Sequence, residues 1–242
     1  MFRSLLLFFF VSLSTSSWAS HVLGGDITWT CDGSGHYVFQ LVFYRDCNGA
    51  DVNTVMVNLE VWNHPTITDI QVDFVSRTDV SPICNQVSGG PNPLLCGTGA
   101  FAGNGIGAIE KIVYQSSPIS LNGTPPPEGW IFTYDDFSRN NALTNIQNPS
   151  TYGITLASRM YAIPGATGAC IDNSPQFLQE PHFASCVGEP YEYNSNPVDI
   201  DLDSISVSFG HPLNNIQGTV FDPPNDPIEL PYEPGFSLNS PT

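Results

Sequence analysis

The sequence predicts an all-β protein, with an antiparallel β-sandwich domain followed by a partial Ig-like or cadherin-like β domain. Apolar and polar side chains alternate in several segments, which places every second side chain on one face of a strand. Glycine and proline each occur 21 times, and clusters of Gly, Pro and Asn separate these segments. No window of a dozen residues carries a helical apolar stripe with caps, so short strands joined by turns are favoured.

The first 19 residues have the pattern of a signal peptide. Arg3 precedes an apolar run over residues 5–13, and Ser17-Trp18-Ala19 forms a small-x-small cleavage site. The apolar run is shorter than the roughly 20 residues that a bilayer-spanning helix needs, and no later segment approaches that length. We therefore expect a secreted or cell-surface protein that begins at Ser20 and has no transmembrane segment in its mature chain.

The first domain is expected to cover residues 20–168. Five of its segments alternate with a period of two and are predicted to be strands. Their apolar positions are Tyr37, Phe39, Leu41 and Phe43; Val55, Val57, Leu59 and Val61; Ile70, Val72 and Phe74; Trp130, Phe132 and Tyr134; and Ile154, Leu156 and Met160.

A domain boundary is predicted at residues 165–175, where small residues lead into an Asx-Pro step of turn and linker type. Short strands are then expected around 176–178, 191–193 and 205–209. The second domain, residues 169–242, is shorter than the roughly 100 residues of a complete Ig-like sandwich, so we expect it to be truncated in this chain.

Three carboxylates alternate in the run Asp199-Ile-Asp201-Leu-Asp203. In an extended chain they lie on one side, about 6.5 Å apart along the backbone, and like charges that close repel. A hard cation with oxygen ligands, Ca²⁺ above all, would convert that repulsion into binding. A solvated acidic turn is the alternative. An EF-hand is excluded, because Gly210 stands where its twelfth-position Glu would be.

All six cysteines follow the signal peptide, and an even number in an exported chain predicts disulfides. Short loops favour the pairs Cys84–Cys96 and Cys170–Cys186. Cys31 and Cys47 are then left over. If residues 32–35 form a tight turn, these two lie about 30 Å apart along one strand, too far for a disulfide. Either that strand breaks, or Cys31 and Cys47 pair with other cysteines.

The formal charge of −17 limits the classes of partner, since the chain has a single lysine, Lys111. So acidic a surface repels nucleic acid and anionic lipid headgroups, and it attracts Ca²⁺. We expect no nucleic-acid partner.

Several stretches resemble one protein family. They are His21-Val-Leu-Gly-Gly-Asp-Ile-Thr-Trp29, Val42-Phe-Tyr-Arg-Asp-Cys-Asn48, Arg139-Asn140 with Asn145-Ile-Gln-Asn-Pro149, Asn173-Ser-Pro-Gln-Phe177, and Asp199 through Ile205. In this order they resemble the N-terminal region of large secreted, adhesin-like proteins of the Bacteroidota that end in a gliding-motility-associated C-terminal domain. The resemblance implies export, attachment to the cell surface, and arrays of Ig-like or cadherin-like modules.

The second region is also similar to cadherin-like and dystroglycan-type Ig modules, which carry an interdomain Ca²⁺ site. Carried over by position, this similarity implies Asp199, Asp201 and Asp203 as ligands, with Asp172 and Asn173 from the linker and Glu189 as a weaker addition.

The leading functional prediction is a non-enzymatic extracellular adhesin-like or structural protein with a Ca²⁺-stabilised joint and an extracellular protein or glycan ligand. A carbohydrate-binding module is the first alternative, and it requires Trp62 and Trp130 to be exposed on one flat face. A secreted polysaccharide-active enzyme is the second. Its candidate acids, Asp135 and Asp136, are adjacent on a strand and would point to opposite faces, so they cannot flank one glycosidic bond.

Overall fold

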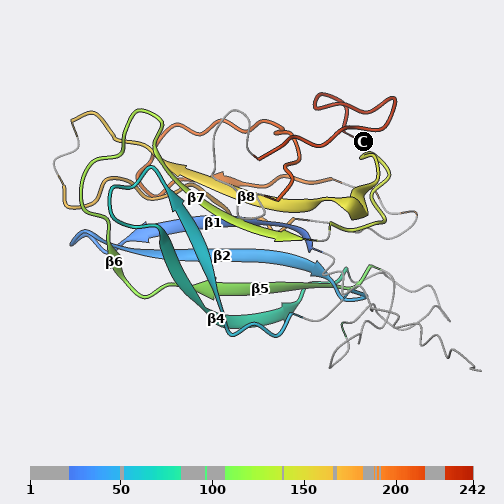
Figure 1. Cartoon of the computed structure of the whole chain (residues 1–242), viewed down its shortest axis with the longest axis horizontal. Coiled ribbons are helices and arrows are strands. Elements are labelled where there is room, and N and C mark those ends of the chain that lie inside the picture. The colour runs from blue at the N-terminus through green and yellow to red at the C-terminus, as the bar shows by residue number, and fades with distance from the viewer. Residues whose placement is uncertain are drawn as a thin grey trace, which may run out of the picture.

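The alternating segments build an antiparallel sheet of eight strands (Figure 1). The computed structural model describes residues 22–49, 52–82, 96, 107–137, 139–165, 168–181, 188, 190, 192–215 and 227–241. The sheet contains β1 (Val22–Cys31), β2 (His36–Asp46), β3 (Met56–Trp62), β4 (Asp69–Asp79), β5 (Ile109–Gln115), β6 (Ile119–Ser120), β7 (Trp130–Phe137) and β8 (Gly153–Met160). A 3₁₀ turn, Pro149–Thr151, is the only helical element in these ranges. The all-β prediction is confirmed.

Five of the strands, β2, β3, β4, β7 and β8, coincide with the five predicted segments. Three strands of the sheet, β1, β5 and the two-residue β6, were not predicted. Gly24 and Gly25 interrupt the apolar alternation of β1. In β5 consecutive residues are buried, because both faces of this central strand are covered, and burial on both faces removes the alternation.

The strand order β1-β2-β5-β4-β3-β7-β8 nearly closes the sheet on itself. The turning point is β4, whose residues 69–73 pair with β3 and residues 73–79 with β5. A bulge between Phe74 and Ser76 marks the change of partner. The bulge also leaves Phe74 43% exposed, although it continues the buried alternation of Ile70 and Val72. Two layers result, with β7 and β8 stacked over β1 and β2 (Figure 1).

Large aromatic side chains fill the space between these layers. Phe39 packs 4.6 Å from Phe132 and Trp29 packs 5.4 Å from Phe132, measured between ring centroids. Trp29 is 2% exposed, and Phe39, Phe132 and Trp130 are fully buried. Burial of this size from both layers supplies the main stabilising term of the fold.

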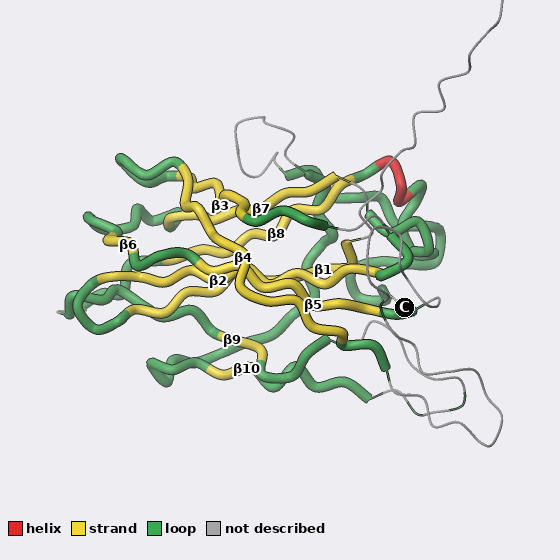
Figure 2. Tube along the Cα trace, turned by 90° about the horizontal axis from the view of Figure 1, so that it is seen from below, coloured by secondary structure: helices red, strands yellow, loops and turns green. Residues whose placement is uncertain are grey.

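After residue 168 the described strands are two short ones, β9 (Gln176–Phe177) and β10 (Pro197–Val198), which pair with each other. Lys111 Nζ of β5 forms an ion pair with Glu180 Oε1 at 2.8 Å. Since the neighbouring Ile112 points into the core, Lys111 points to the opposite face of the sheet. The segment around β9 and β10 therefore lies over that outer face, separated from β7 and β8 by the layer of β1, β2 and β5 (Figure 2).

The strand predicted around residues 176–178 is confirmed as β9, whereas the one predicted at 205–209 is wrong. Residues 205–209 pair with no strand among the described residues, and Val207 and Phe209 are 61% and 72% exposed. The prediction at 191–193 includes Tyr191, which lies outside the described residues, and Glu192 and Tyr193 are not in a strand. Alternation fails at 205–209 because a strand also needs a partner edge.

The disulfide pairing differs from the prediction. Cys31 bonds to Cys170, and Cys47 bonds to Cys96. Cys47 N–H donates to Ala108 O and Cys96 N–H to Asp79 Oδ2, which brings both cysteines to the end of the sheet where β2, β5 and β4 lie side by side. The pairs Cys84–Cys96 and Cys170–Cys186 are thus wrong, because adjacency of strands rather than short loop length decides which sulfurs meet. Cys84 and Cys186 lie outside the described residues, as does the predicted signal peptide.

Across the described ranges, no helix has the length and apolar character that crossing a bilayer requires.

Candidate functional site

Residues 171–175, the second half of the linker predicted at 165–175, run along the outer edge of β1. Trp29 N–H donates to Ser174 Oγ at 2.8 Å, and Ser174 N–H donates to Trp29 O at 3.1 Å. Next to this pair, Cys31 N–H donates to Asn173 Oδ1 at 2.6 Å. The linker therefore satisfies backbone groups that β1 would otherwise leave open at its edge.

Tyr37 anchors the start of the linker from inside the sheet. Its ring is 1% exposed, and its hydroxyl oxygen accepts a hydrogen bond from Ile171 N–H at 2.5 Å. Together with the Cys31–Cys170 disulfide, this contact fixes Asp172 and Asn173 at the end of the β1–β2 hairpin. No sequence pattern had indicated this role for Tyr37, since its apolar periodicity shows only that the ring is buried.

The acidic run forms a tight turn rather than the extended strand that was expected. Asp199 Oδ1 accepts hydrogen bonds from Asp201 N–H at 2.8 Å and from Asp203 N–H at 3.3 Å. Leu202 adopts a left-handed backbone conformation with φ of 66°. A side chain that bonds to the backbone two residues ahead is an Asx turn, and Asp favours it over a strand.

The linker and the acidic turn meet through Asn173 and Asp201. Asn173 N–H donates to Asp201 Oδ2 at 2.7 Å, and the Asn173 side-chain amide lies 3.0 and 3.1 Å from the two carboxylate oxygens. The structure therefore joins the two predicted halves of the site, which are 28 residues apart in the sequence.

Negative charge accumulates where the two halves meet. The pKa of Asp172 is raised to about 6, first by burial and then by the charges of Asp199, Asp201 and Asp203. The charge of Asp172 also contributes to raising the pKa of Tyr37, where burial is the largest cause. These four carboxylates form no ion pair with a lysine or arginine among the described residues. A divalent cation would relieve their mutual repulsion.

The donor set fits a hard cation, because Asp172, Asp199, Asp201 and Asp203 supply carboxylate oxygens. Asn173 fits less well as a ligand. Its side-chain oxygen already accepts from Cys31 N–H, and its amide group faces Asp201. Asn173 is therefore the bridge that orients Asp201. Glu189 lies outside the described residues.

One tight cluster of potential metal-ligand atoms occurs within the described residues, and it lies elsewhere than the acidic turn. Cys47, Cys96 and Glu110 place their ligand atoms within 4.8 Å of one another. The two sulfurs are bonded in a disulfide, and Glu110 Oε1 accepts from Arg45 Nε at 2.6 Å. This cluster therefore has neither thiolates nor a free carboxylate to offer to a metal.

The surface required by the carbohydrate-binding alternative does not form. Trp130 is fully buried in the core, 4.6 Å from the ring of His64. Trp62 is only partly exposed, and its indole N–H donates to Thr133 Oγ1 at 2.8 Å. The two rings thus cannot form one flat exposed platform.

No protein-family model, curated protein or solved structure matches this chain at a significant level.

Proposed function

We propose that this chain belongs to an exported, non-enzymatic, adhesin-like protein of the cell surface, in which Ca²⁺ stabilises the joint between the large sheet and the acidic turn. The observation that carries the proposal is the direct contact between Asn173 and Asp201, which holds the acidic turn beside Asp172. Extracellular β modules commonly use such carboxylate sites at their joints, with dissociation constants of about 10⁻⁴ to 10⁻³ M.

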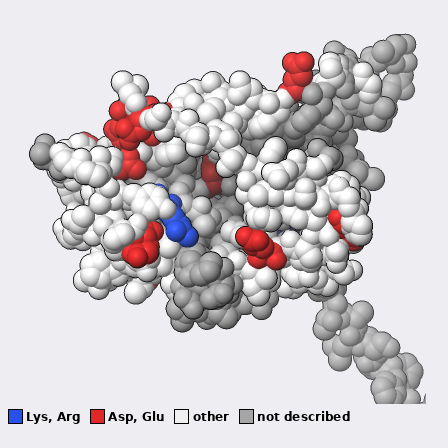
Figure 3. Space-filling model, turned by 90° about the horizontal axis from the view of Figure 1, so that it is seen from above, with Lys and Arg blue, Asp and Glu red and all other residues white. Residues whose placement is uncertain are grey.

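Three further observations support an extracellular location. The two disulfides are stable in oxidising compartments and rare in the cytosol. The formal charge is −17, and on the face drawn in Figure 3 the exposed charged side chains are mainly acidic. The stretches quoted above also resemble the N-terminal regions of secreted Bacteroidota adhesins. The extracellular protein or glycan that the module would contact is not identified by these features.

In this proposal Ca²⁺ would be held by Asp199, Asp201 and Asp203, with Asp172 adjoining from the linker. Its role is structural, because it neutralises clustered charge and so joins the turn to the end of the β1–β2 hairpin. Asn173 contributes by orienting Asp201 rather than by ligating the ion.

The proposal is tested by two measurements on the exported protein. Thermal unfolding in Ca²⁺ and in chelator should differ, with the Ca²⁺ form the more stable. Protease treatment of intact cells should digest the protein without lysis. Identical unfolding curves would remove the Ca²⁺ part, and complete protection in intact cells would remove the surface location.

A further inference from the structure

The two terminal strands of the large sheet, β1 and β8, face each other without pairing. β1 pairs only with β2, and β8 pairs only with β7. An isolated bridge between Val22 and Arg139 closes one end of this seam, and Ser174 covers β1 at Trp29 near the other end. A groove of about 450 Å³ lies between these two points, a volume typical of ligand sites.

Backbone groups of both strands are directed toward this groove. Trp29 uses its N–H and C=O on the open side of β1, and in an antiparallel ladder every second residue points the same way. Gly25 and Ile27 therefore direct their backbone N–H and C=O groups into the groove. On β8, Gly153 N–H donates to Asn214 Oδ1 and Gly153 O accepts from Arg139 Nε, both on the side away from β7. The backbone N–H and C=O groups of Thr155 and Ala157 therefore point to that side as well. An extended peptide can bind such edges by strand addition.

Arg139 lies at one end of the groove without a counter-charge. It is 7% exposed, its Nε donates to Gly153 O at 3.1 Å, and its Nη2 donates to Leu213 O at 2.7 Å. Among the described residues no carboxylate forms an ion pair with it. Burial alone lowers the pKa of Arg139 to about 10, so the side chain keeps its charge at neutral pH. A buried guanidinium that bonds only carbonyls is suited to accept a ligand carboxylate.

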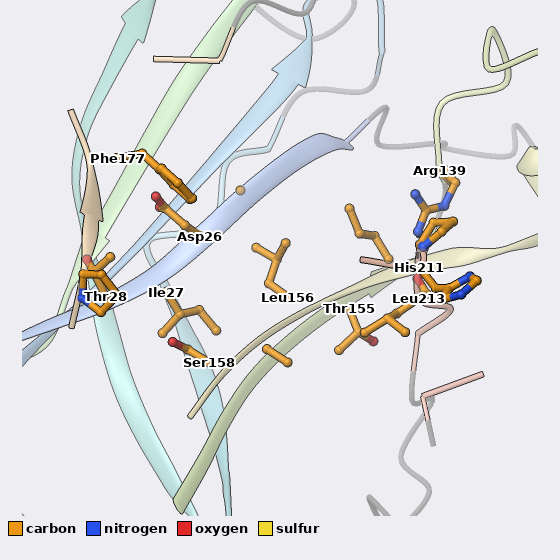
Figure 4. A pocket seen from close by; sticks show the side chains of 15 residues that line it. Asp26, Ile27, Thr28, Arg139, Thr155, Leu156, Ser158, Phe177, His211 and Leu213 are labelled. Carbon is orange, nitrogen blue, oxygen red and sulfur yellow. Dashed lines mark hydrogen bonds between the residues drawn. The ribbon is translucent and has the colours of Figure 1, made fainter. Parts of the chain in front are cut away.

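The opposite end of the groove carries a carboxyl group. Asp26 lines it, and Asp26 Oδ1 is buried without a hydrogen-bond partner. Burial raises the pKa of Asp26, and the charge of Lys111 acts in the opposite direction. Figure 4 shows Arg139 and His211 grouped at one end and Asp26 beside Phe177 at the other. The groove thus presents a guanidinium group at one end, a carboxyl group at the other, and hydrogen-bonding backbone groups along its length.

We infer that this groove, defined by Gly25, Ile27, Thr155, Ala157 and Arg139, binds the C-terminal segment of an extended peptide, with the terminal carboxylate on Arg139. Because Arg139 adjoins the start of β1 at Val22, the bound peptide runs antiparallel to β1. The unpartnered Oδ1 of Asp26 favours a hydrogen-bond donor such as lysine or arginine further back in the peptide. This site is separate from the acidic turn, so it stands whether or not Ca²⁺ binds there.

The test uses the whole exported chain and two peptide pools. Each pool contains N-acetylated tetrapeptides of Val, Thr and Lys, with either a free C-terminal carboxylate or a C-terminal amide. Backbone NMR shifts measured at millimolar peptide should move at Gly25, Ile27 and Thr155 with the carboxylate pool. A charge-assisted hydrogen bond predicts at least about tenfold tighter binding of that pool than of the amide pool.

Variants separate binding from folding. Arg139→Gln should remove the preference for the carboxylate pool, whereas Arg159→Gln removes a charge from an exposed position of β8 outside the groove and should not. If Arg139→Gln fails to fold, Ala157→Trp fills the groove from an exposed position and should abolish the shifts. The inference is overturned if the two pools bind equally, if neither moves these amides, or if Ala157→Trp folds and still binds.

Discussion

Asn173 holds Asp201 through its backbone N–H, at 2.7 Å, and through its side-chain amide, at 3.0 and 3.1 Å. The same Asn173 side chain accepts from Cys31 N–H at 2.6 Å, so a single residue links the edge of β1 to the acidic turn. One consequence is that Asp201 is oriented before any cation arrives. A preorganised carboxylate loses less conformational freedom on binding than a mobile one.

Replacing Asp201 by Asn is expected to abolish most of the stabilisation by Ca²⁺, because it removes one charge while keeping the shape of the side chain. With a dissociation constant of about 10⁻⁴ M and roughly 2 mM free Ca²⁺, the wild-type chain should gain about 1.8 kcal/mol. Thermal unfolding with Ca²⁺ and with chelator measures the gain. Asp69→Asn, at an exposed position on β4, is the matched control. An undiminished gain in Asp201→Asn would show that this carboxylate is not a ligand.

Without Ca²⁺, stability should fall as the pH rises from about 4 to about 6. Asp172 has an ordinary pKa of 3.8 and a folded pKa of about 6, so the unfolded chain loses this proton first and deprotonation favours unfolding. Since Asp172 is only partly buried, screening reduces the effect to on the order of 1 kcal/mol. Urea unfolding in chelator across this range should show a steeper loss for wild type than for Asp172→Asn. Equal slopes would contradict the raised pKa.

Peptide mapping under non-reducing conditions should recover Cys31 linked to Cys170 and Cys47 linked to Cys96. The first bond spans 139 residues of sequence, and the chain-entropy model assigns about 5 kcal/mol to a loop of that length. The Cys31→Ser/Cys170→Ser variant should therefore unfold at much lower denaturant concentration. A peptide that joins Cys84 to Cys96 would instead restore the short-loop pairing.

Gly25→Ala should destabilise the fold by about 1–3 kcal/mol, because an added Cβ would lie 2.3 Å from Val42 O and 2.8 Å from Leu156 Cδ1. Gly210→Ala is the control, since nothing lies within 4 Å of the Cβ added there, and it should be neutral or slightly stabilising. Denaturant midpoints compare the two variants. Equal midpoints would mean that β8 does not approach β1 this closely.

Ser174→Ala should cost about 1–3 kcal/mol, because it leaves the buried N–H of Trp29 without its acceptor at 2.8 Å. Ser34→Ala, which removes an exposed hydroxyl in the β1–β2 turn, is the control. Amide hydrogen exchange at Trp29 should accelerate in Ser174→Ala alone. Unchanged exchange there would show that the linker does not cover the edge of β1.

Local sequence patterns were sufficient to predict that the fold is built of β-strands and to select the residues of the candidate site. Alternation identified β2, β3, β4, β7 and β8, since the period of a half-buried strand is visible in the sequence itself. The same alternation misled at Ile205–Phe209, where the described residues offer no partner edge. The alternation of apolar residues did not identify β1, because a glycine stands at position 25, where Leu156 of the opposite layer leaves no room for a side chain.

The sequence by itself determined that the protein is all-β and acidic and has an even number of cysteines, and it selected Asp172, Asn173 and the Asp199–Asp203 run as candidate hard-oxygen ligands. Only the tertiary structure decided which cysteines pair, that the run is a turn, and that Asn173 orients Asp201. It also decided that Arg139 bonds carbonyls beside the open seam. The physical reason is that alternation and composition are properties of neighbouring residues. Disulfides, charge clusters and strand edges instead depend on which distant segments the closing sheet brings together.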